Sequence, residues 1–355
     1  MEEKKILVIN PGSTSTKIGL FIGEKQLFVT NIEHLDKDIN AFSSVFEQFD
    51  FRLNAIKAVL EEQKIDLSTL DGVIGRGGLL RSIPSGIYQI NDKMLEELKS
   101  AARGEHPSNL GAFFARHFGQ ALNIPYWIAD PVAVDEMLDF VKITGIKEIK
   151  RASLFHALNQ KSVVRKIAKQ LNKNVEDTNF VVAHLGGGFS FGTHIKGKVV
   201  DVSNAIYGEA SFSPERVGQV PGVLFYEYAL KNNLSLSQVK KIFGKEGGLY
   251  SHFKSKDMRY IFEKDNDLEN KDLIWEAICY QISKSIMAYT TLAKGKLDGI
   301  IITGGIANSK QLVAKVKEYI DWVAPIYIVP GEDELSALNE MAQLVLNNKI
   351  ETKEY

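Results

Sequence analysis

The chain contains one short pattern twice, and this internal repeat restricts its fold more than any other feature. The segment LDGVIGRGG at residues 70–78 returns as LDGIIITGG at residues 297–305. Each copy reads as a short buried strand that ends in paired glycines, and each follows a stretch with apolar residues at helical spacing. These helical positions are Leu53, Ile56 and Leu60 before the first copy, and Ile274, Ile278, Ile282 and Ile286 before the second. The repeat indicates two related halves.

The start of each half also repeats. Residues 6–21, ILVINPGSTSTKIGLF, give an apolar strand, a turn of small and hydroxyl residues, and a second strand. Residues 180–201, FVVAHLGGGFSFGTHIKGKVVD, have the same layout. Because hairpin and strand-Gly-Gly unit occur in the same order in both halves, we predict a duplicated α/β domain. A chain of 355 residues is long enough for two domains.

The domain boundaries follow from two further segments. Residues 124–138, IPYWIADPVAVDEML, are interpreted as a strand that ends at Asp130-Pro131, followed by the start of a helix, so we place the crossover near residue 132. The helical pattern from Glu334 onward is expected to return to the first domain. The first domain is therefore expected to comprise residues 1–131 plus 334–355, and the second to comprise residues 132–333.

Composition narrows the possible partners. Lys and Arg number 43 and Asp and Glu 44, so no overall charge favours nucleic acid or an acidic membrane. The single cysteine, Cys279, cannot form an internal disulfide, which is typical of a reducing compartment. The N-terminal MEEKK has acids where a signal peptide has basic residues, and no run approaches the roughly 18 apolar residues of a spanning helix. We expect a cytoplasmic protein with a small polar ligand, and no nucleic-acid or membrane partner.

Two turns have the composition of phosphate sites. The first hairpin turn offers backbone N–H groups, the hydroxyls of residues 13–16 and the charge of Lys17. The second contains Gly186, Gly187 and Gly188, which destabilise a strand-rich segment unless a group must approach the backbone closely. Each turn alone could be a plain surface hairpin, but two of them from duplicated domains could bind one polyphosphate.

Other nucleotide and metal motifs are absent. None of the three Gly-Lys pairs is followed by Ser or Thr, and no strand is followed by G-x-G-x-x-G, which excludes Walker A, Rossmann and protein-kinase sites. Cysteine and histidine ligand spacings are also missing. A metal, if bound, should therefore have oxygen ligands, as Mg²⁺ does.

Taken together, the motifs resemble the acetate and butyrate kinase family within the actin, hexokinase and Hsp70 superfamily. The matching segments, in family order, are VINPGSTSTK (8–17), EHPSNLG (105–111), SLFHALNQ (153–160), HLGGGFS (184–190), KDMRY (256–260) and TGGIAN (303–308). The resemblance implies α/β architecture with two duplicated ribonuclease H-like (actin-like ATPase) domains, an active-site cleft between them, and nucleotide binding by the second domain. It further implies ATP/ADP and Mg²⁺ as cofactors, reversible phosphorylation of a small carboxylate to an acyl phosphate, and a homo-oligomer.

Within this family the chain is more similar to the butyrate kinases than to the acetate kinases. Pro11 replaces the usual alanine, residues 75–78 read GRGG, and the chain is shorter. Gly78 stands where acetate kinases have a valine that closes the acyl pocket, so we expect room for a longer acyl chain. Alternatives are an acetate, propionate or branched-chain carboxylate kinase, a sugar kinase with Asp130 as its base, and a nucleotide switch that polymerises like actin.

The resemblance also assigns residues to roles. The expected catalytic residues are Asn10, Arg76, Asp130, His156 and Arg216. The expected phosphate and nucleotide residues are Ser13, Ser15, Lys17, His184, Gly186, Gly187, Gly188, Asp257, Arg259, Gly304, Gly305, Ile306 and Asn308. The expected acyl-pocket residues are Gly78, His106, Phe155 and Pro214. The expected metal ligands are Asp130, Glu332 and Asp333, although which acid of 332–334 reaches the metal stays open.

For two of these residues, Arg76 and His156, the expected chemistry can be described. Arg76, at the end of the first repeated strand, could grip a carboxylate at two points. His156 is expected near the start of a helix capped by Ser153, where the family histidine donates a hydrogen bond to the transferring phosphoryl group. His184 is open to two interpretations, a core histidine or a wall of the active site.

Overall fold

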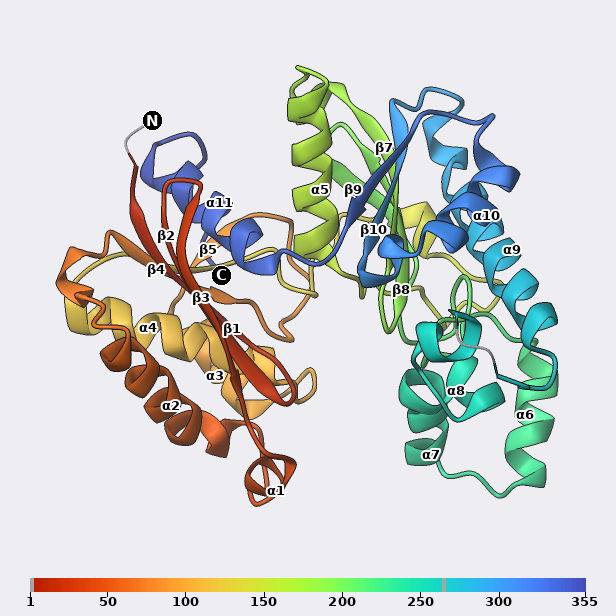
Figure 1. Ribbon diagram of the computed structural model, residues 1–355, viewed down its shortest axis with the longest axis horizontal. Coiled ribbons are helices and arrows are strands. Elements are labelled where there is room, and N and C mark those ends of the chain that lie inside the picture. The colour runs from red at the N-terminus through yellow and green to blue at the C-terminus, as the bar shows by residue number, and fades with distance from the viewer. Residues whose placement is uncertain (1–2, 264–265) are drawn as a thin grey trace. The chain divides into compact units, whose positions relative to one another are not determined.

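The computed structural model describes residues 3–263 and 266–355, so the first two residues of the acidic N-terminus lie outside the described part. The chain divides into two compact units. Unit 1 consists of Met1–Val134, Ala157–Asn159 and Asp333–Tyr355, and unit 2 of Asp135–His156 and Gln160–Glu332. Figure 1 draws most of unit 1 in red to yellow and most of unit 2 in green to blue.

Unit 1 is built on a six-stranded sheet in the order β3-β2-β1-β4-β6-β5. The strands are β1 (Lys5–Pro11), β2 (Ser15–Ile22), β3 (Lys25–Glu33), β4 (Gly72–Arg76), β5 (Ile87–Gln89) and β6 (Tyr126–Ala129). Strands β1, β2 and β3 form an antiparallel meander, whereas β1, β4 and β6 run parallel. The helices are α1 (Asp36–Ile39), α2 (Phe49–Glu62), α3 (Asp92–Ser100), α4 (Gly111–Leu122) and α11 (Glu334–Leu346).

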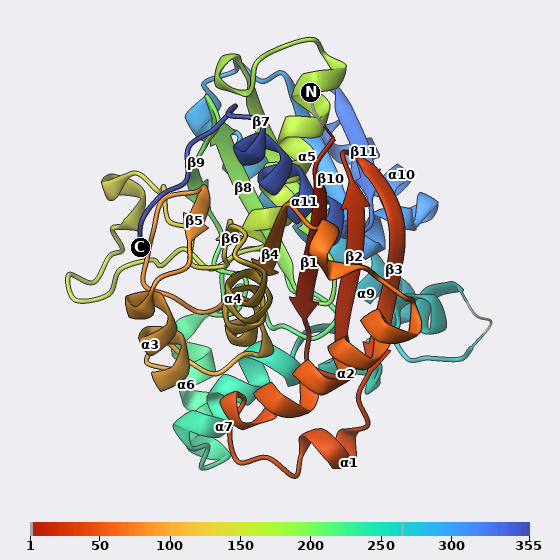
Figure 2. The ribbon, with the colours of Figure 1, turned by 90° about the vertical axis from the view of Figure 1, so that its left-hand side faces the viewer.

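Both faces of this sheet are covered because its strands alternate apolar residues toward two separate cores. Leu7 and Ile9 of β1 pack in the core with α2, α3 and α4, whereas Ile6 and Val8 pack in the core with α11. Figure 2 shows α2 and α4 in front of the sheet and α11 behind it. The helical pattern expected from Glu334 is confirmed.

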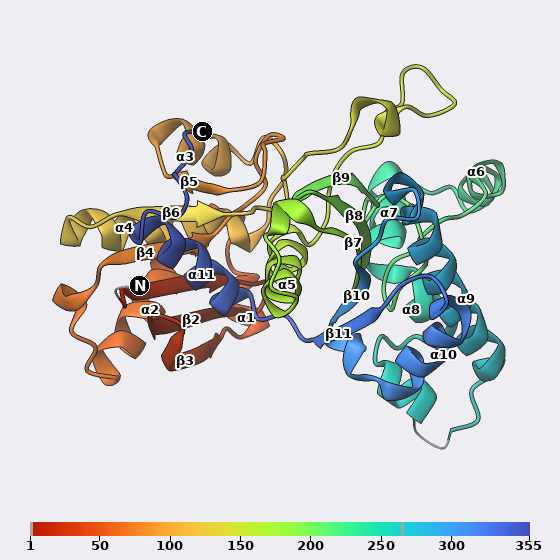
Figure 3. The same cartoon turned by 90° about the horizontal axis from the view of Figure 1, so that it is seen from above.

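Unit 2 has a five-stranded sheet in the order β11-β10-β7-β8-β9. The strands are β7 (Asn179–Leu185), β8 (Phe189–Ile195), β9 (Lys198–Val202), β10 (Gly299–Gly304) and β11 (Ile326–Pro330). The helices are α5 (Ala157–Gln170), which begins in unit 1, and α6 (Gly222–Lys231), α7 (Leu236–Lys241), α8 (Gly248–Phe253), α9 (Lys271–Tyr289) and α10 (Lys310–Ile320). Figure 3 shows α5 on one side of the sheet and α9 and α10 on the other.

The two sheets have the same core topology, so the predicted α/β duplication is confirmed. In each sheet an antiparallel meander is extended by two parallel strands, which are β4 and β6 in unit 1 and β10 and β11 in unit 2. The repeated LDG segments lead into β4 and β10, at equivalent positions. The helices expected before them are α2 and α9, and their marker residues are buried or packed on a core.

Two local expectations were wrong. Residues 131–138 form no helix after β6. Val134 instead makes an isolated β-bridge with Ile83, and the Asp135 carboxylate accepts the Met137 N–H, a local turn that competes with a helical start. Helix α5 begins at Ala157 with His156 rather than Ser153 at the N-cap position.

Two further observations concern α9 and the helices in general. Cys279 lies on α9, fully buried in the core with Ile278 and Ile282, and burial raises the pKa of its thiol to about 12. Within residues 3–263 and 266–355, no helix is both long and apolar enough to cross a membrane.

Candidate active site

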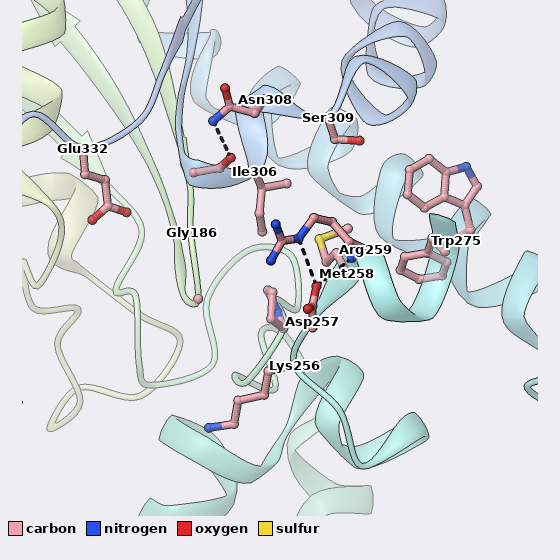
Figure 4. A pocket seen from close by; sticks show the side chains of 14 residues that line it. Gly186, Lys256, Asp257, Met258, Arg259, Trp275, Ile306, Asn308, Ser309 and Glu332 are labelled. Atoms are coloured by element: carbon pink, nitrogen blue, oxygen red, sulfur yellow. Dashed lines mark hydrogen bonds and ion pairs between the residues drawn. The ribbon is translucent and has the colours of Figure 1, made fainter. Parts of the chain in front are cut away.

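Unit 2 contains a pocket of about 760 Å³, within the range of small-molecule sites. Figure 4 shows that its wall comes from the glycine turn after β7, the segment before α9, the start of α10 and the end of β11. The lining residues expected from the sequence are Gly186, Gly187, Pro214, Asp257, Arg259, Gly305, Ile306, Asn308 and Glu332. The structure therefore brings together segments that lie up to 146 residues apart in the chain, the separation of Gly186 and Glu332.

The glycine turn after β7 is held closely by side chains of its own unit. A Cβ on Gly186 would lie 2.9 Å from Glu332 Oε1, and a Cβ on Gly188 would clash with the guanidinium of Arg216. Ser213 fixes the turn from the other side, since its hydroxyl donates to the Gly187 carbonyl at 2.8 Å. The close backbone approach expected here is thus made, in part, by residues of this chain.

Arg216 contacts this turn directly. One terminal nitrogen donates to the Ala205 carbonyl at 2.8 Å, and among the described residues its buried Nε makes no hydrogen bond. Burial lowers the pKa of Arg216. The guanidinium is therefore a positive group packed beneath a glycine turn, where a phosphate oxygen would be stabilised.

The second glycine pair follows β10. Gly304 has φ +89°, and a Cβ on it would clash with the Leu185 carbonyl, so only glycine fits there. Around Gly305 the described residues leave the Cβ direction open. Asn308 donates to the Gly305 carbonyl at 3.0 Å, and Ser309 caps α10. The loop thus presents its backbone to the pocket while its shape is fixed by local hydrogen bonds.

Asp257 organises the exposed side of the pocket. Its carboxylate accepts the N–H groups of Tyr260 at 3.3 Å and Arg259 at 2.9 Å, and these bonds hold the pKa of Asp257 below its usual value. Lys256 pairs with Glu215 at 2.8 Å. The Arg259 side chain is largely exposed and extends along the pocket wall in Figure 4. A charged, solvated rim of this kind suits a nucleotide more than an apolar ligand.

His156 is oriented by a chain of buried polar groups. Burial, together with the charge of Lys161, holds the pKa of His194 well below its usual value, and His194 Nε2 donates to Gln160 Oε1 at 3.0 Å. Gln160 Nε2 donates to Ser190 Oγ at 3.0 Å, which directs the Ser190 hydroxyl toward His156 Nδ1 at 2.8 Å. His156 Nδ1 is then an acceptor, so the ring carries its N–H on Nε2.

In unit 1 the end of β4 presents Arg76 to a carboxylate. Arg76 holds Glu334 at two points, with both N···O distances at 3.0 Å, and Asn10 donates to the same carboxylate at 2.6 Å. Lys17 is the cross-strand partner of Asn10, so their side chains share one face of the β1–β2 hairpin. Ser13 is exposed in the turn between the two strands, and Ser15, the first residue of β2, is half-buried.

Asp130 follows β6 and lies at the same edge of the sheet as Asn10 and Arg76, because β1, β4 and β6 are parallel neighbours. Its Oδ1 accepts the Ser85 hydroxyl at 2.7 Å and the Gly86 N–H at 2.8 Å. Within the described part of the chain, no group of three or more His, Cys, Asp or Glu is arranged to hold a metal. The oxygens of Asn10 and Asp130 nevertheless fit Mg²⁺, which binds through one or two carboxylates and completes its shell with phosphate and water.

The three acids at 332–334 have three different partners. Glu332 meets His184 Nε2 at 3.0 Å, and Glu334 binds Arg76. Asp333 is the N-cap of α11 and accepts the Ser336 N–H. Asp333 Oδ1 is thus engaged in capping α11, and the assignment of Asp333 to a metal stays a prediction.

The expected acyl-pocket residues are distributed over both units. His106 caps a short 3₁₀ helix in unit 1, Phe155 is buried in unit 2, and Pro214 lines the nucleotide-sized pocket. The argument from Gly78 was wrong. A Cβ there would lie 2.5 Å from Asn109 Oδ1 and 2.8 Å from Leu98 Cδ2, so neighbouring side chains already fill the space that we expected to be free.

Several contributors were missed from the sequence. Lys256, Met258, Phe262, Trp275 and Ser309 also line the pocket, and Ser190 and Gln160 orient His156. Lys256, Met258, Ser190 and Gln160 belong to the KDMRY, HLGGGFS and SLFHALNQ segments quoted from the sequence, which was the available signal. Ser309 directly follows TGGIAN, whereas Phe262 and Trp275 lie outside every quoted segment.

Two sheets of one topology, the second of them beside a pocket lined by glycine turns, define a duplicated two-domain α/β fold. Among the solved structures that share this fold are the following three. The acetate kinase of Porphyromonas gingivalis is 19% identical with a TM-score of 0.76, and the match covers 96% of this chain and 100% of that one. The propionate kinase of Francisella tularensis is 21% identical at 0.70 (95% and 98% covered). The acetate kinase of Entamoeba histolytica is 17% identical at 0.74 (95% and 98% covered).

A match to a family sequence model identifies the family of the chain. A sequence model of the acetokinase family matches residues 143–328, more than half of the chain. The chain belongs to the acetokinase family, whose members phosphorylate a carboxylate with ATP.

Proposed function

We propose that the chain is a butyrate kinase, which transfers the terminal phosphoryl group of ATP reversibly to butyrate and related short-chain carboxylates. The observation that carries the carboxylate part is the two-point contact of Arg76 with Glu334 at 3.0 Å. A substrate carboxylate can make the same contact, and planar bidentate recognition is what a guanidinium does best. The pocket of unit 2 supplies the nucleotide part of the proposal.

The roles follow from the chemistry of phosphoryl transfer, which needs positioning and charge stabilisation. The substrate carboxylate is already ionised, so no base is required. Arg76 would hold this carboxylate, while His156 Nε2–H and Arg216 would donate to the transferring group. Lys17, Ser13 and Ser15 would contact phosphate oxygens. Asn10 and Asp130 would hold Mg²⁺, which neutralises phosphate charge when bound.

Butyrate is proposed on sequence grounds, which are Pro11, the GRGG segment at 75–78 and the length of the chain. The packed surroundings of Gly78 lend no support to an enlarged pocket at that point. Two methylenes beyond acetate are worth about 1.6 kcal/mol, from roughly 0.8 kcal/mol per buried CH₂, and hence roughly a tenfold preference.

An acyl-hydroxamate assay tests the proposal. Purified protein, ATP and Mg²⁺ are supplied with acetate, propionate, butyrate, isobutyrate or valerate, and kcat/KM is compared. We expect a maximum at butyrate. A maximum at acetate, propionate or isobutyrate would keep the reaction class and overturn the substrate. No hydroxamate from any acid, with ADP binding intact, would overturn the class and favour a sugar acceptor or nucleotide-dependent polymerisation.

We also propose a homo-oligomer that works in the cytoplasm. Every residue of α6 is at least partly exposed, and Val223, Leu224 and Tyr226 each expose more than 60% of their surface. Apolar surface of this kind is typical of an interface between copies. Light scattering coupled to size exclusion measures the mass, and a monomeric mass at micromolar concentration would contradict the oligomer.

A further inference from the structure

Arg52 is a fully buried cation on α2 that donates all of its hydrogen bonds to neutral oxygens. Nε donates to Gln48 Oε1 at 3.0 Å, and Nη2 donates to the Ser13 carbonyl at 2.9 Å. Nη1 donates to the carbonyls of Gly12 at 2.9 Å and Ser15 at 3.1 Å. Within residues 3–263 and 266–355, no acidic side chain forms an ion pair with it.

This charge is retained at neutral pH. Burial lowers the pKa of Arg52 only to about 10, so the guanidinium stays protonated. A buried charge is expensive unless polar groups surround it, and here the turn between β1 and β2 supplies them. Figure 2 shows α2 passing beside that end of the hairpin.

The hydrogen bonds from Arg52 to the turn determine the direction in which the N–H groups of the turn point. The carbonyls of Gly12 and Ser13 point toward Arg52, and no cis peptide bond occurs in the described chain. In a trans peptide the C=O of one residue and the N–H of the next point in opposite directions. The N–H groups of Ser13 and Thr14 therefore point away from Arg52, and both residues are exposed.

On the basis of the function proposed above, we propose that Arg52 is a positioning residue that shapes residues 12–16 into a site for a phosphoryl oxyanion. The guanidinium binds the carbonyls on one side of the turn, so the N–H groups of Ser13 and Thr14 lie on the other side, and successive backbone N–H groups of a turn are a known arrangement for binding anions. Its uncompensated positive charge also favours an anion at the turn.

A simpler role for Arg52 is a tie between α2 and the hairpin that matters for stability alone. The two roles differ in what a neutral substitution does to anion binding. Arg52→Gln removes the charge and most of the donors. Ile56→Val, one turn further along the same helix and also fully buried, loosens the packing of α2 without touching the turn.

Hydrogen exchange read by mass spectrometry locates the effect, with inorganic pyrophosphate as the probe. In the unsubstituted protein and in Ile56→Val, we expect pyrophosphate to slow exchange in peptides that contain residues 12–16. In Arg52→Gln we expect faster exchange there and no protection by pyrophosphate. Equal protection in Arg52→Gln, or no protection of the turn in the unsubstituted protein, would overturn the positioning role.

Turnover gives a second readout, in the hydroxamate assay. We expect at least a tenfold lower kcat for Arg52→Gln and less than a twofold change for Ile56→Val, with ADP affinity of unit 2 unchanged in both. If Arg52→Gln does not fold, Arg52→Lys replaces it, and because lysine keeps the charge but not the planar fork of donors, partial loss of protection and of kcat is expected. Full activity of a folded Arg52 variant would overturn the inference. Lack of activity in the unsubstituted protein, with Arg52-dependent protection by pyrophosphate, would overturn the proposed function and leave the anion site standing.

Discussion

The imidazole rings of His156 and His184 lie almost parallel, with their centroids 3.7 Å apart and their planes inclined by 10°. The two rings have different hydrogen-bond partners, since Glu332 meets Nε2 of His184 at 3.0 Å and the Ser190 hydroxyl meets Nδ1 of His156 at 2.8 Å. Because Ser190 donates to Nδ1, His156 carries its N–H on Nε2 and can donate from that nitrogen.

Ser190→Ala should lower kcat about tenfold with little change in KM for ATP. Without the hydroxyl, His156 Nδ1 loses the group that fixes its tautomer, and a fraction of molecules presents an acceptor to the phosphoryl group. Steady-state kinetics measure the effect. The control is Ser203→Ala, since Ser203 is equally buried but accepts the Phe191 N–H and does not touch His156. Equal losses in both variants would contradict the orienting role.

Arg76→Ala should lower kcat by about 10²- to 10³-fold, by analogy with removal of an oxyanion donor. Arg76→Lys should recover little, because an ammonium cannot make the two-point contact seen with Glu334. The hydroxamate assay with butyrate measures both. Arg116→Ala, which removes a guanidinium that pairs with exposed Asp92 in the same unit, is the control. A loss below tenfold for Arg76→Ala would remove Arg76 from the mechanism.

Gly78→Ala should destabilise unit 1 by about 1–3 kcal/mol, the usual penalty for overpacking. Its Cβ would lie 2.5 Å from Asn109 Oδ1, an oxygen that accepts the Leu79 N–H. Urea denaturation measures the change. Gly305→Ala is the matched substitution, because its Cβ meets open space in the described structure, so stability should be kept while KM for ATP rises. Unchanged stability together with altered acyl-chain preference for Gly78→Ala would restore the abandoned pocket argument.

His34 should make stability fall in mild acid. Burial, helped by the charge of Arg52, lowers its pKa from 6.5 to about 4. Between these values the unfolded chain binds more protons than the folded one, so the stabilisation is complete above about pH 6.5 and is lost as the pH falls toward 4. Urea denaturation at pH 7.5, 5.5 and 4.5 should show a shallower decline in His34→Gln than in the unsubstituted protein. Identical slopes would contradict this.

The sequence predicts the features that depend on local pattern. The repeated LDG segments, the helices marked by Leu53 and Ile278, and the two glycine turns all lie where periodicity and turn chemistry place them. The same is true of Asp257, Gly305 and Asn308, which line the pocket as family motifs suggest.

The features that the sequence did not predict depend on contacts between residues far apart in the chain. Nothing near Glu334 in the sequence signals its contact with Arg76, 258 residues away, or separates its role from that of the capping Asp333. In the sequence, Gly78 suggests free space because glycine has no side chain. In the structure, the side chain of Asn109 occupies that space. Arg52 stands four residues before Ile56 in the sequence, but nothing near it signals the carbonyls of Gly12 and Ser13 that accept its hydrogen bonds, 40 and 39 residues away.

The reactivity of Cys279 can report the opening of the core of unit 2. The chain has one thiol, and it lies deep in the core of α9 with a raised pKa, so alkylating reagents reach it as a thiolate only after that core has opened. The rate of labelling therefore counts openings of unit 2 alone, without a mutation or a fluorophore. Measured with and without ADP, the labelling rate would show how much bound ADP slows the opening of unit 2.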